Sequence, residues 1–284
     1  MYFATISSPH KNFHPAILED GMFRPLPYSD IVEVIKAGAT VAASHAYPPM
    51  LLEGALDAGS RNTLEGSGKR SDILLHAPLH PPTLRDAYAF EGHVKTANKN
   101  RGRDVPSEWY DFPVFYFTNP HSIFGPDEVI PYPPYTSELD YELEVAVVIG
   151  KPGMDIKAED AEENIFGYTI FNDWSARDVP RAEMKVGLGP AKGKDFASTL
   201  GPLIVTKEAL SDRATGRPGV YDLAMSAKVN GVEMSRGNLK DIYWSFGEII
   251  ARASQSVMLM PGDVVELEVE RIGILRNTIG EDTP

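Results

Sequence analysis

Most of the chain after residue 75 shows the apolar patterning of β-strands. Six segments there are rich in Val, Ile, Phe, Tyr and Thr, which fit the pleated surface of a sheet. Apolar residues at roughly helical spacing predict a helix over 239–254, and an acidic first turn favours another over 158–164. Near the end, 264–271 and 274–279 are expected to form a hairpin. The six strand segments are 112–118, 141–149, 167–171, 203–206, 225–229 and 264–270.

The first 75 residues differ from the rest of the chain in this pattern. They predict a strand over 1–7, a hairpin around Asp20 and Gly21, and a helix over 31–37. Gly and Ser then become frequent between 51 and 69, and a proline-rich run follows. Because such clusters interrupt regular structure, we expect a small N-terminal domain over 1–75 and a larger, mostly β domain over 76–284.

Composition narrows the class of protein. The chain has 284 residues, of which 43% are hydrophobic, so it can fill a sizeable core and is not mainly disordered. Its 27 Lys and Arg against 40 Asp and Glu give a net charge of −13, which argues against nucleic acid as a partner. The absence of cysteine excludes disulfides, Cys-ligated zinc and a cysteine nucleophile. With no apolar run long enough for a bilayer and no signal-peptide pattern, we expect a cytoplasmic protein without a membrane partner.

Acidic residues begin the strand segment 141–149. In a strand, Asp140, Glu142 and Glu144 share a face that turns apolar further along. Like charges at the end of a buried face raise each other's pKa unless a cation lies between them. Carboxylate oxygens suit Mg²⁺, Ca²⁺ or Mn²⁺. This segment alone fits two interpretations: a divalent-metal site, or an exposed strand end with solvated acids.

Three other positions could contribute to such a site. Asp173 follows the strand segment 167–171 and could be an oxygen ligand, although it could equally cap a helix or pair with Arg177. Lys194 lies in a Gly-rich stretch that does not match a phosphate-binding loop. His93 lies near the carboxylate of Asp86 in the sequence, although a lone histidine is more often structural.

Four motifs, in order along the chain, together resemble the fumarylacetoacetate hydrolase family. They are R-D-A-Y-A-F-E-G-H from residue 85, L-D-Y-E-L-E-V-A-V-V-I-G from 139, N-D-W-S-A-R-D from 172 and G-K-D-F from 193. The resemblance extends from about residue 84 to the C-terminus. It implies an α+β, mostly β fold with a mixed β-roll or sandwich, a small N-terminal domain, and assembly as a homodimer.

The resemblance also implies a role for particular side chains. The family's metal-binding carboxylates fall on Asp86, Glu142, Glu144 and Asp173, and the metal is expected to be Mg²⁺, with Ca²⁺ or Mn²⁺ as alternatives. The water-activating histidine falls on His93. The remaining positions, which bind substrate or support the metal site, are Tyr88, Tyr116, Arg177 and Lys194. Of these, Arg177 and Lys194 are expected to attract an anionic substrate to the reaction centre.

The implied activity is metal-dependent hydrolysis of a carbon–carbon bond in a β-diketo acid similar to fumarylacetoacetate or an acylpyruvate. Two substrate oxygens would chelate the cation, and His93 would act as general base on water. In a second hypothesis the metal takes part in the reaction but no water molecule does. The chain would then be a decarboxylase or isomerase of a 2-oxo diacid in aromatic catabolism. A third is a non-catalytic protein that binds metal or a small acid.

The sequence departs from the family at several places. Pro180 and Met184 stand where the hydrolase has polar substrate contacts, and the arginine that follows the catalytic histidine has no clear counterpart. The family's Gly-Thr-rich loop, which carries the glutamate that orients the histidine, is missing between Leu259 and Pro261. Either the loop is deleted or the numbering passes over a mobile segment. We favour the mobile segment, because such loops are often mobile without a ligand.

Overall fold

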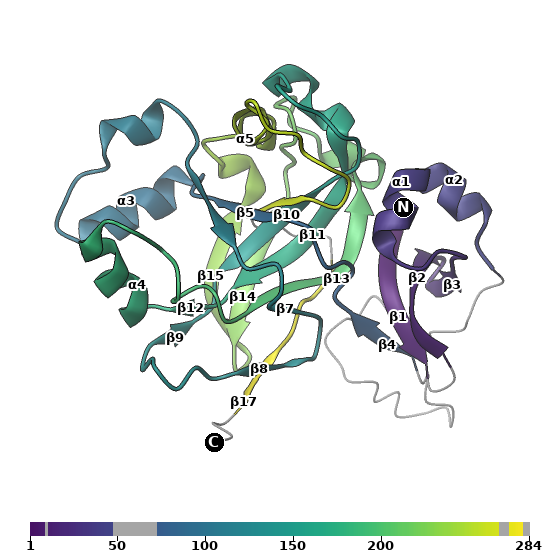
Figure 1. Cartoon of the computed structure of the whole chain (residues 1–284), viewed down its shortest axis with the longest axis horizontal. Coiled ribbons are helices and arrows are strands. Elements are labelled where there is room, and N and C mark those ends of the chain that lie inside the picture. Colours follow the sequence, from purple (N-terminus) through teal and green to yellow (C-terminus); the bar gives the residue numbers. More distant parts are fainter. Residues whose placement is uncertain (9–10, 48–72, 267–272, 281–284) are drawn as a thin grey trace.

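The computed structural model describes residues 1–8, 11–47, 73–266 and 273–280 of the chain. In this part an eleven-stranded mixed sheet runs through the molecule, and short helices lie around it (Figure 1). The predicted α+β, mostly β class is therefore confirmed.

The strand order of the sheet is β3-β2-β1-β13-β11-β10-β16-β5-β6, with β4 paired to β1 and β7 to β13. Most neighbours are antiparallel, whereas β16 and β5 are parallel, as are β13 and β7. The strands are β1 (Tyr2–Ser8), β2 (Lys11–Glu19), β3 (Met22–Pro25), β4 (Leu74–His76), β5 (Leu84–Ala87), β6 (Phe115–Thr118), β7 (Ile123–Phe124), β10 (Leu143–Ile149), β11 (Ile165–Asp173), β13 (Ser198–Thr206) and β16 (Val264–Glu266).

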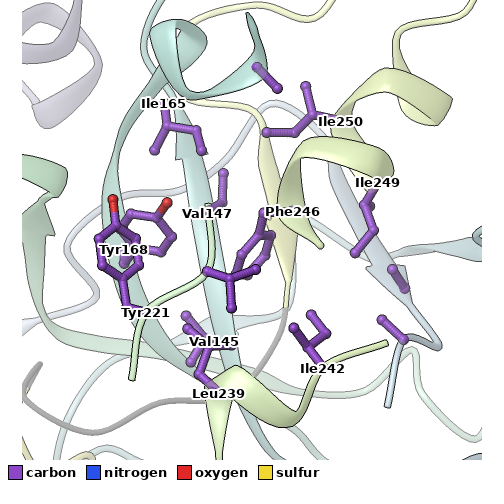
Figure 2. Close-up of a cluster of buried hydrophobic side chains, with 14 of the residues drawn as sticks. Val145, Val147, Ile165, Tyr168, Tyr221, Leu239, Ile242, Phe246, Ile249 and Ile250 are labelled. Atoms are coloured by element: carbon purple, nitrogen blue, oxygen red, sulfur yellow. The ribbon is translucent and has the colours of Figure 1, made fainter. Parts of the chain in front are cut away.

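The central strand β10 is buried on both faces. Its odd-numbered residues, Val145 and Val147 among them, pack in the cluster that contains Phe246 and Ile249 of α5 (Phe246–Ala253) (Figure 2). Its even-numbered residues Ala146 and Val148 belong to a second cluster on the opposite face. A run of apolar residues in a strand is the pattern that burial on both faces requires. This double burial holds the acidic start of the strand in place.

The N-terminal strands continue the main sheet, because β1 pairs with β13 with Tyr2 opposite Val205. The predicted hairpin is confirmed: β2 and β3 are joined through Asp20 and Gly21, both with positive φ. The predicted helix over 31–37 is α1 (Ile31–Ala37), followed by α2 (Ala39–Ser44). The Gly- and Ser-rich segment 51–69 lies within 48–72, outside the described residues. The domain boundary near 75 stays a prediction.

Several elements differ in extent or pairing from the sequence predictions. The expected helix over 239–254 is divided into the 3₁₀ helix η5 (Leu239–Asp241) and α5, and 158–164 is the 3₁₀ helix η2 (Ala158–Asn164). The expected C-terminal hairpin is wrong in its second arm, since β17 (Thr278–Gly280) pairs with β8 (Val129–Pro131), while 267–272 lie outside the described residues.

The other elements are α3 (Glu91–Asn100), η1 (Ser107–Tyr110), α4 (Asp178–Glu183), η3 (Met184–Val186), η4 (Lys207–Arg213), the pair β9 (Leu139–Asp140) and β12 (Ser175–Ala176), and the pair β14 (Ala224–Val229) and β15 (Val232–Asn238).

A short turn joins α5 to β16 where the family's Gly-Thr-rich loop was expected. The backbone N–H of Met260 donates to the Asp263 carboxylate at 2.8 Å, and the N–H of Asp263 donates to the Met260 carbonyl at 3.0 Å. At the start of the turn, Leu259 forms an isolated β-bridge with Gly153. At its end, the N–H of Gly262 donates to the carbonyl of Ile149 at 2.9 Å. The turn is continuous, so the expected mobile segment has no place here and the loop has no counterpart between Leu259 and Pro261.

Candidate metal and oxo-acid site

The candidate site lies at one end of four strands that are close together in the sheet. Asp86 is on β5, Tyr116 on β6, Glu144 on β10, and Asp173 ends β11. The pairing places Asp86 opposite Tyr116 and Glu144 opposite Phe171. The sheet thereby brings Asp86 and Asp173, which are far apart in the sequence, close to each other.

Three of the four predicted metal ligands converge. Oxygen atoms of Asp86, Glu142 and Glu144 all lie within 4.8 Å of one another. Asp86 is buried and the two glutamates are half-buried. Asp140, which shares the predicted alternation, is outside this group and forms an ion pair with Arg177 at 2.9 Å.

Two cations hold Glu142. One of its carboxylate oxygens accepts from Arg177 and the other from Lys194. Lys194 is buried and also forms an ion pair with Asp173 at 2.6 Å. Burial would raise the pKa of Glu142, but the charges of Lys194 and Arg177 outweigh it and lower the pKa to about 2. Glu142 is therefore a carboxylate over the whole physiological pH range.

Tyr116 connects Asp86 and Asp173. Its hydroxyl contacts one carboxylate oxygen of Asp86 and one of Asp173. Burial, and then the charge of Asp173, raise the pKa of Asp86 to about 8, although Lys194 opposes the shift. Burial also raises the pKa of Asp173. Tyr116 therefore lies among the acidic groups, and its predicted contact with substrate stays a prediction.

His93 and Tyr88 lie close enough to the acidic group for the charge of Glu142 to affect the pKa of each. His93 is on the first turns of α3, and its ring meets that of Tyr88 edge to face at 5.3 Å between centroids. Desolvation by the surrounding protein lowers the pKa of His93, and Arg177 and Lys194 lower it further, against the charge of Glu142. His93 is therefore neutral near pH 7 and able to accept a proton. Within the described part of the chain, no carboxylate hydrogen-bonds to its ring.

The donor set fits a hard divalent cation. Three carboxylate oxygens that approach one another in a partly buried place repel unless a cation or protons intervene. In addition, Asp173 Oδ1 is buried, and no described residue hydrogen-bonds to it, although buried carboxylate oxygens normally accept hydrogen bonds. Oxygen-only donors of this kind are those that Mg²⁺, Mn²⁺ and Ca²⁺ prefer.

The structure also shows residues near the site that the sequence did not indicate. The indole of Trp109 donates a hydrogen bond to the Tyr88 carbonyl, and that of Trp244 donates to the Trp109 carbonyl. A buried indole N–H usually finds an acceptor, which is the available signal in the sequence. The identity of that acceptor depends on the fold and could not be predicted.

Fold and site together define a class: a mostly β, α+β protein with a carboxylate cluster at the end of its central strands. The family model described as "Fumarylacetoacetate (FAA) hydrolase C-terminal" matches residues 83–267, more than half of the chain. The chain belongs to the fumarylacetoacetate hydrolase family.

Similar proteins include two tautomerases and a hydrolase. The chain is 30% identical over 197 residues to "Oxaloacetate tautomerase YisK" of Bacillus subtilis, an alignment covering 69% of this chain and 61% of that protein. It is 34% identical over 200 residues to "Oxaloacetate tautomerase FAHD2A, mitochondrial" of Homo sapiens, covering 69% and 58%. The match thus spans about three fifths of the length of these relatives. The fold is also that of a fumarylacetoacetate hydrolase from Exiguobacterium antarcticum, with a TM-score of 0.73, 24% identity, and coverage of 99% of this chain and 100% of that one.

None of the helices in the described ranges is long and apolar enough to cross a membrane.

Proposed function

We propose that the chain is a divalent-metal-dependent tautomerase or isomerase of a small 2-oxo diacid, of which oxaloacetate is the first candidate. The observation that carries the proposal is the convergence of Asp86, Glu142 and Glu144 beside a His93 ring that no carboxylate of the described residues holds. The relatives named as oxaloacetate tautomerases support the same class of reaction.

The choice between isomerase and hydrolase depends on what His93 has to do. Hydrolysis of a carbon–carbon bond requires an activated water molecule, and a histidine base is normally oriented by a third group. Such a group is missing among the described residues, and the loop that would supply it is replaced by the turn at 259–263. Tautomerisation moves one proton from the carbon beside the oxo group to the oxo oxygen and needs no water molecule. The site therefore favours tautomerisation over hydrolysis.

In this mechanism Asp86, Glu142 and Glu144 would hold the cation, with Asp173 as a further candidate ligand. When bound, the cation supplies positive charge that stabilises developing negative charge on the oxo acid. Arg177 and Lys194 keep Glu142 ionised. Their positive charges also oppose, at the site, the repulsion of an anionic substrate by a chain whose net charge is −13. The neutral imidazole of His93 accepts the proton from carbon at a ring nitrogen, and returning that proton to oxygen completes the reaction.

Chelation and one histidine variant test the proposal. EDTA should abolish the acceleration of oxaloacetate keto–enol exchange followed by ultraviolet absorbance, and Mg²⁺ or Mn²⁺ should restore it. His93→Ala should reduce kcat by about 10²–10⁴-fold, as expected for loss of a general base, while the Mg²⁺ dissociation constant measured by calorimetry stays the same. The matched control is His121→Ala, at an exposed position outside the site, which should leave both values unchanged.

Three results would contradict the proposal. Full activity in EDTA would exclude the metal-dependent mechanism. Cleavage of an acylpyruvate into two acids, with slow tautomerisation, would establish the hydrolase hypothesis instead. Tight binding of oxaloacetate without turnover would establish the non-catalytic hypothesis. The homodimer, the cytoplasmic location and a place in aromatic catabolism remain predictions from the sequence.

A further inference from the structure

Four aromatic side chains form a cluster beside the start of α3. Trp109 lies 4.9 Å, between ring centroids, from both Tyr110 and Tyr243, and Tyr243 lies 5.0 Å from Trp244. Trp109 is buried, whereas Tyr110 and Tyr243 are partly exposed. Two segments far apart in the sequence, η1 and the residues that follow η5, thus meet here. We name these four residues the aromatic clamp.

The clamp holds the backbone on which Tyr88 is carried. The indole N–H of Trp109 donates to the Tyr88 carbonyl at 2.7 Å, and the indole N–H of Trp244 donates to the Trp109 carbonyl at 3.0 Å. The backbone N–H of Tyr243 donates to the carbonyl of Ala89 at 3.1 Å. The carbonyls of two consecutive residues are therefore both fixed by the clamp.

The clamp also fixes the first residue of α3. The hydroxyl of Tyr110 donates to the Glu91 carboxylate at 2.9 Å. The N-cap of this helix, Phe90, provides no side-chain cap, so the start of α3 lacks its usual anchor. His93 is two residues beyond Glu91. The first turn of α3, which carries His93, is therefore held in part by contacts that lie outside the site.

We propose that the aromatic clamp, and the indole N–H of Trp109 in particular, positions Tyr88 and His93 for the reaction. This inference rests on the proposed function. A phenylalanine ring would fill most of the same apolar space, so the indole contributes chiefly its hydrogen bond to the Tyr88 carbonyl. A displacement of about 1 Å in a reacting group can reduce a rate by about 10²-fold. Loss of that one donor should therefore affect turnover more than folding.

The first test is Trp109→Phe, which keeps an aromatic ring and removes the donor. We expect kcat for oxaloacetate tautomerisation to fall about tenfold, with the Mg²⁺ dissociation constant changed less than twofold because Asp86, Glu142 and Glu144 are held by β5 and β10 and their neighbours. The control is Ile249→Val, a large-to-small substitution at a buried position of α5, which should leave kcat unchanged. An unchanged kcat in Trp109→Phe, or equal losses in both variants, would overturn the proposal.

A mutant cycle separates positioning from general damage. In a background with both Tyr88→Ala and His93→Ala, Trp109→Phe should reduce kcat less than twofold, because the groups to be positioned are gone. A tenfold loss in that background as well would show that Trp109 acts independently of Tyr88 and His93 and would overturn the proposal.

Hydrogen exchange gives a readout that does not depend on turnover. Amides of residues 88–97 should exchange at least tenfold faster in Trp109→Phe than in the unsubstituted protein, with amides of β10 unchanged. If the unsubstituted protein is inactive on 2-oxo diacids while this acceleration is observed, the proposed function fails and the holding of α3 by the clamp stands. Unchanged exchange in this segment overturns the clamp whatever the activity.

Discussion

The ammonium group of Lys194 is almost completely withdrawn from solvent between two carboxylates. It bonds to Glu142 and lies 2.6 Å from an oxygen of Asp173. Burial would lower the pKa of Lys194, but Asp173 and Glu142 outweigh it and raise the pKa. Lys194 therefore stays charged and holds Glu142 and Asp173 together, while Arg177 is a second cation on Glu142.

Substitution of this lysine should be costly for the fold. Lys194→Met should lower the free energy of unfolding of the EDTA-treated protein by about 3 kcal/mol, because removal of one partner leaves buried carboxylates without their cation. The matched control is Lys192→Met, which removes an exposed ion pair with Asp195 and should cost only about 0–1 kcal/mol. Urea denaturation measures both, and equal losses would contradict the role given to Lys194.

At this scale the residue types of the site could be predicted from the sequence, and their partners could not. The alternation before Val145 indicated clustered acids, and the motifs indicated Lys194 and Arg177. That both cations bind Glu142 depends on contacts across 35 and 52 positions of the chain. Such contacts follow from sheet register, which no local pattern specifies.

The helix α5 shows how a local polar pair sets the limits of an element. Apolar spacing favoured one helix over 239–254, but Ser245 and Glu248 form a capping box that begins α5 at Phe246. The backbone N–H of Ser245 donates to Glu248 at 2.8 Å, and the N–H of Glu248 donates to the Ser245 hydroxyl at 3.2 Å. The signal was present in the sequence as S-x-x-E, and the hydrophobic spacing concealed it.

Removal of this cap should destabilise the protein measurably. Ser245→Ala should lower the free energy of unfolding by about 1 kcal/mol, since the N–H of Glu248 loses its acceptor. Ser226→Ala, at an exposed position of β14, serves as the control and should change it by less than about 0.5 kcal/mol. A cost at Ser245 no larger than at Ser226 would show that the capping box contributes nothing to α5.

Long buried strands were easier to predict than short ones. β10 lies close to its predicted segment, because apolar and β-branched residues continue through it. β7, β9 and β12 have two residues each and follow from tertiary pairing, so they carry no pattern of their own.

Across the whole molecule, the N-terminal strands share a core with the sheet that carries the site. Phe3 is fully buried, belongs to the same cluster as Ala146 and Val264, and lies 5.4 Å from Phe166 between ring centroids. The Gly- and Ser-rich segment and the proline-rich run after it suggested a separate domain, but such segments do not report which strands pair.

Unfolding should therefore involve both regions together. All three tryptophans lie after residue 75, so their fluorescence reports on the larger part of the chain. Phe3→Ala should lower the free energy of unfolding measured by this fluorescence by about 3–5 kcal/mol. Phe13→Ala, at an exposed position of the neighbouring strand β2, should have a much smaller effect. A tryptophan transition that Phe3→Ala leaves in place would establish an independent N-terminal domain.

The compact connection between Leu259 and Asp263 has a consequence for protein engineering. Its two flanks are already fastened to Gly153 and Ile149, so a foreign peptide spliced after Met260 would leave and re-enter the scaffold at adjacent points. Each doubling of the length of such a peptide would cost only about 0.6 kcal/mol in closure entropy. A peptide inserted at this junction should therefore leave the pairing of β10 and β16 unchanged.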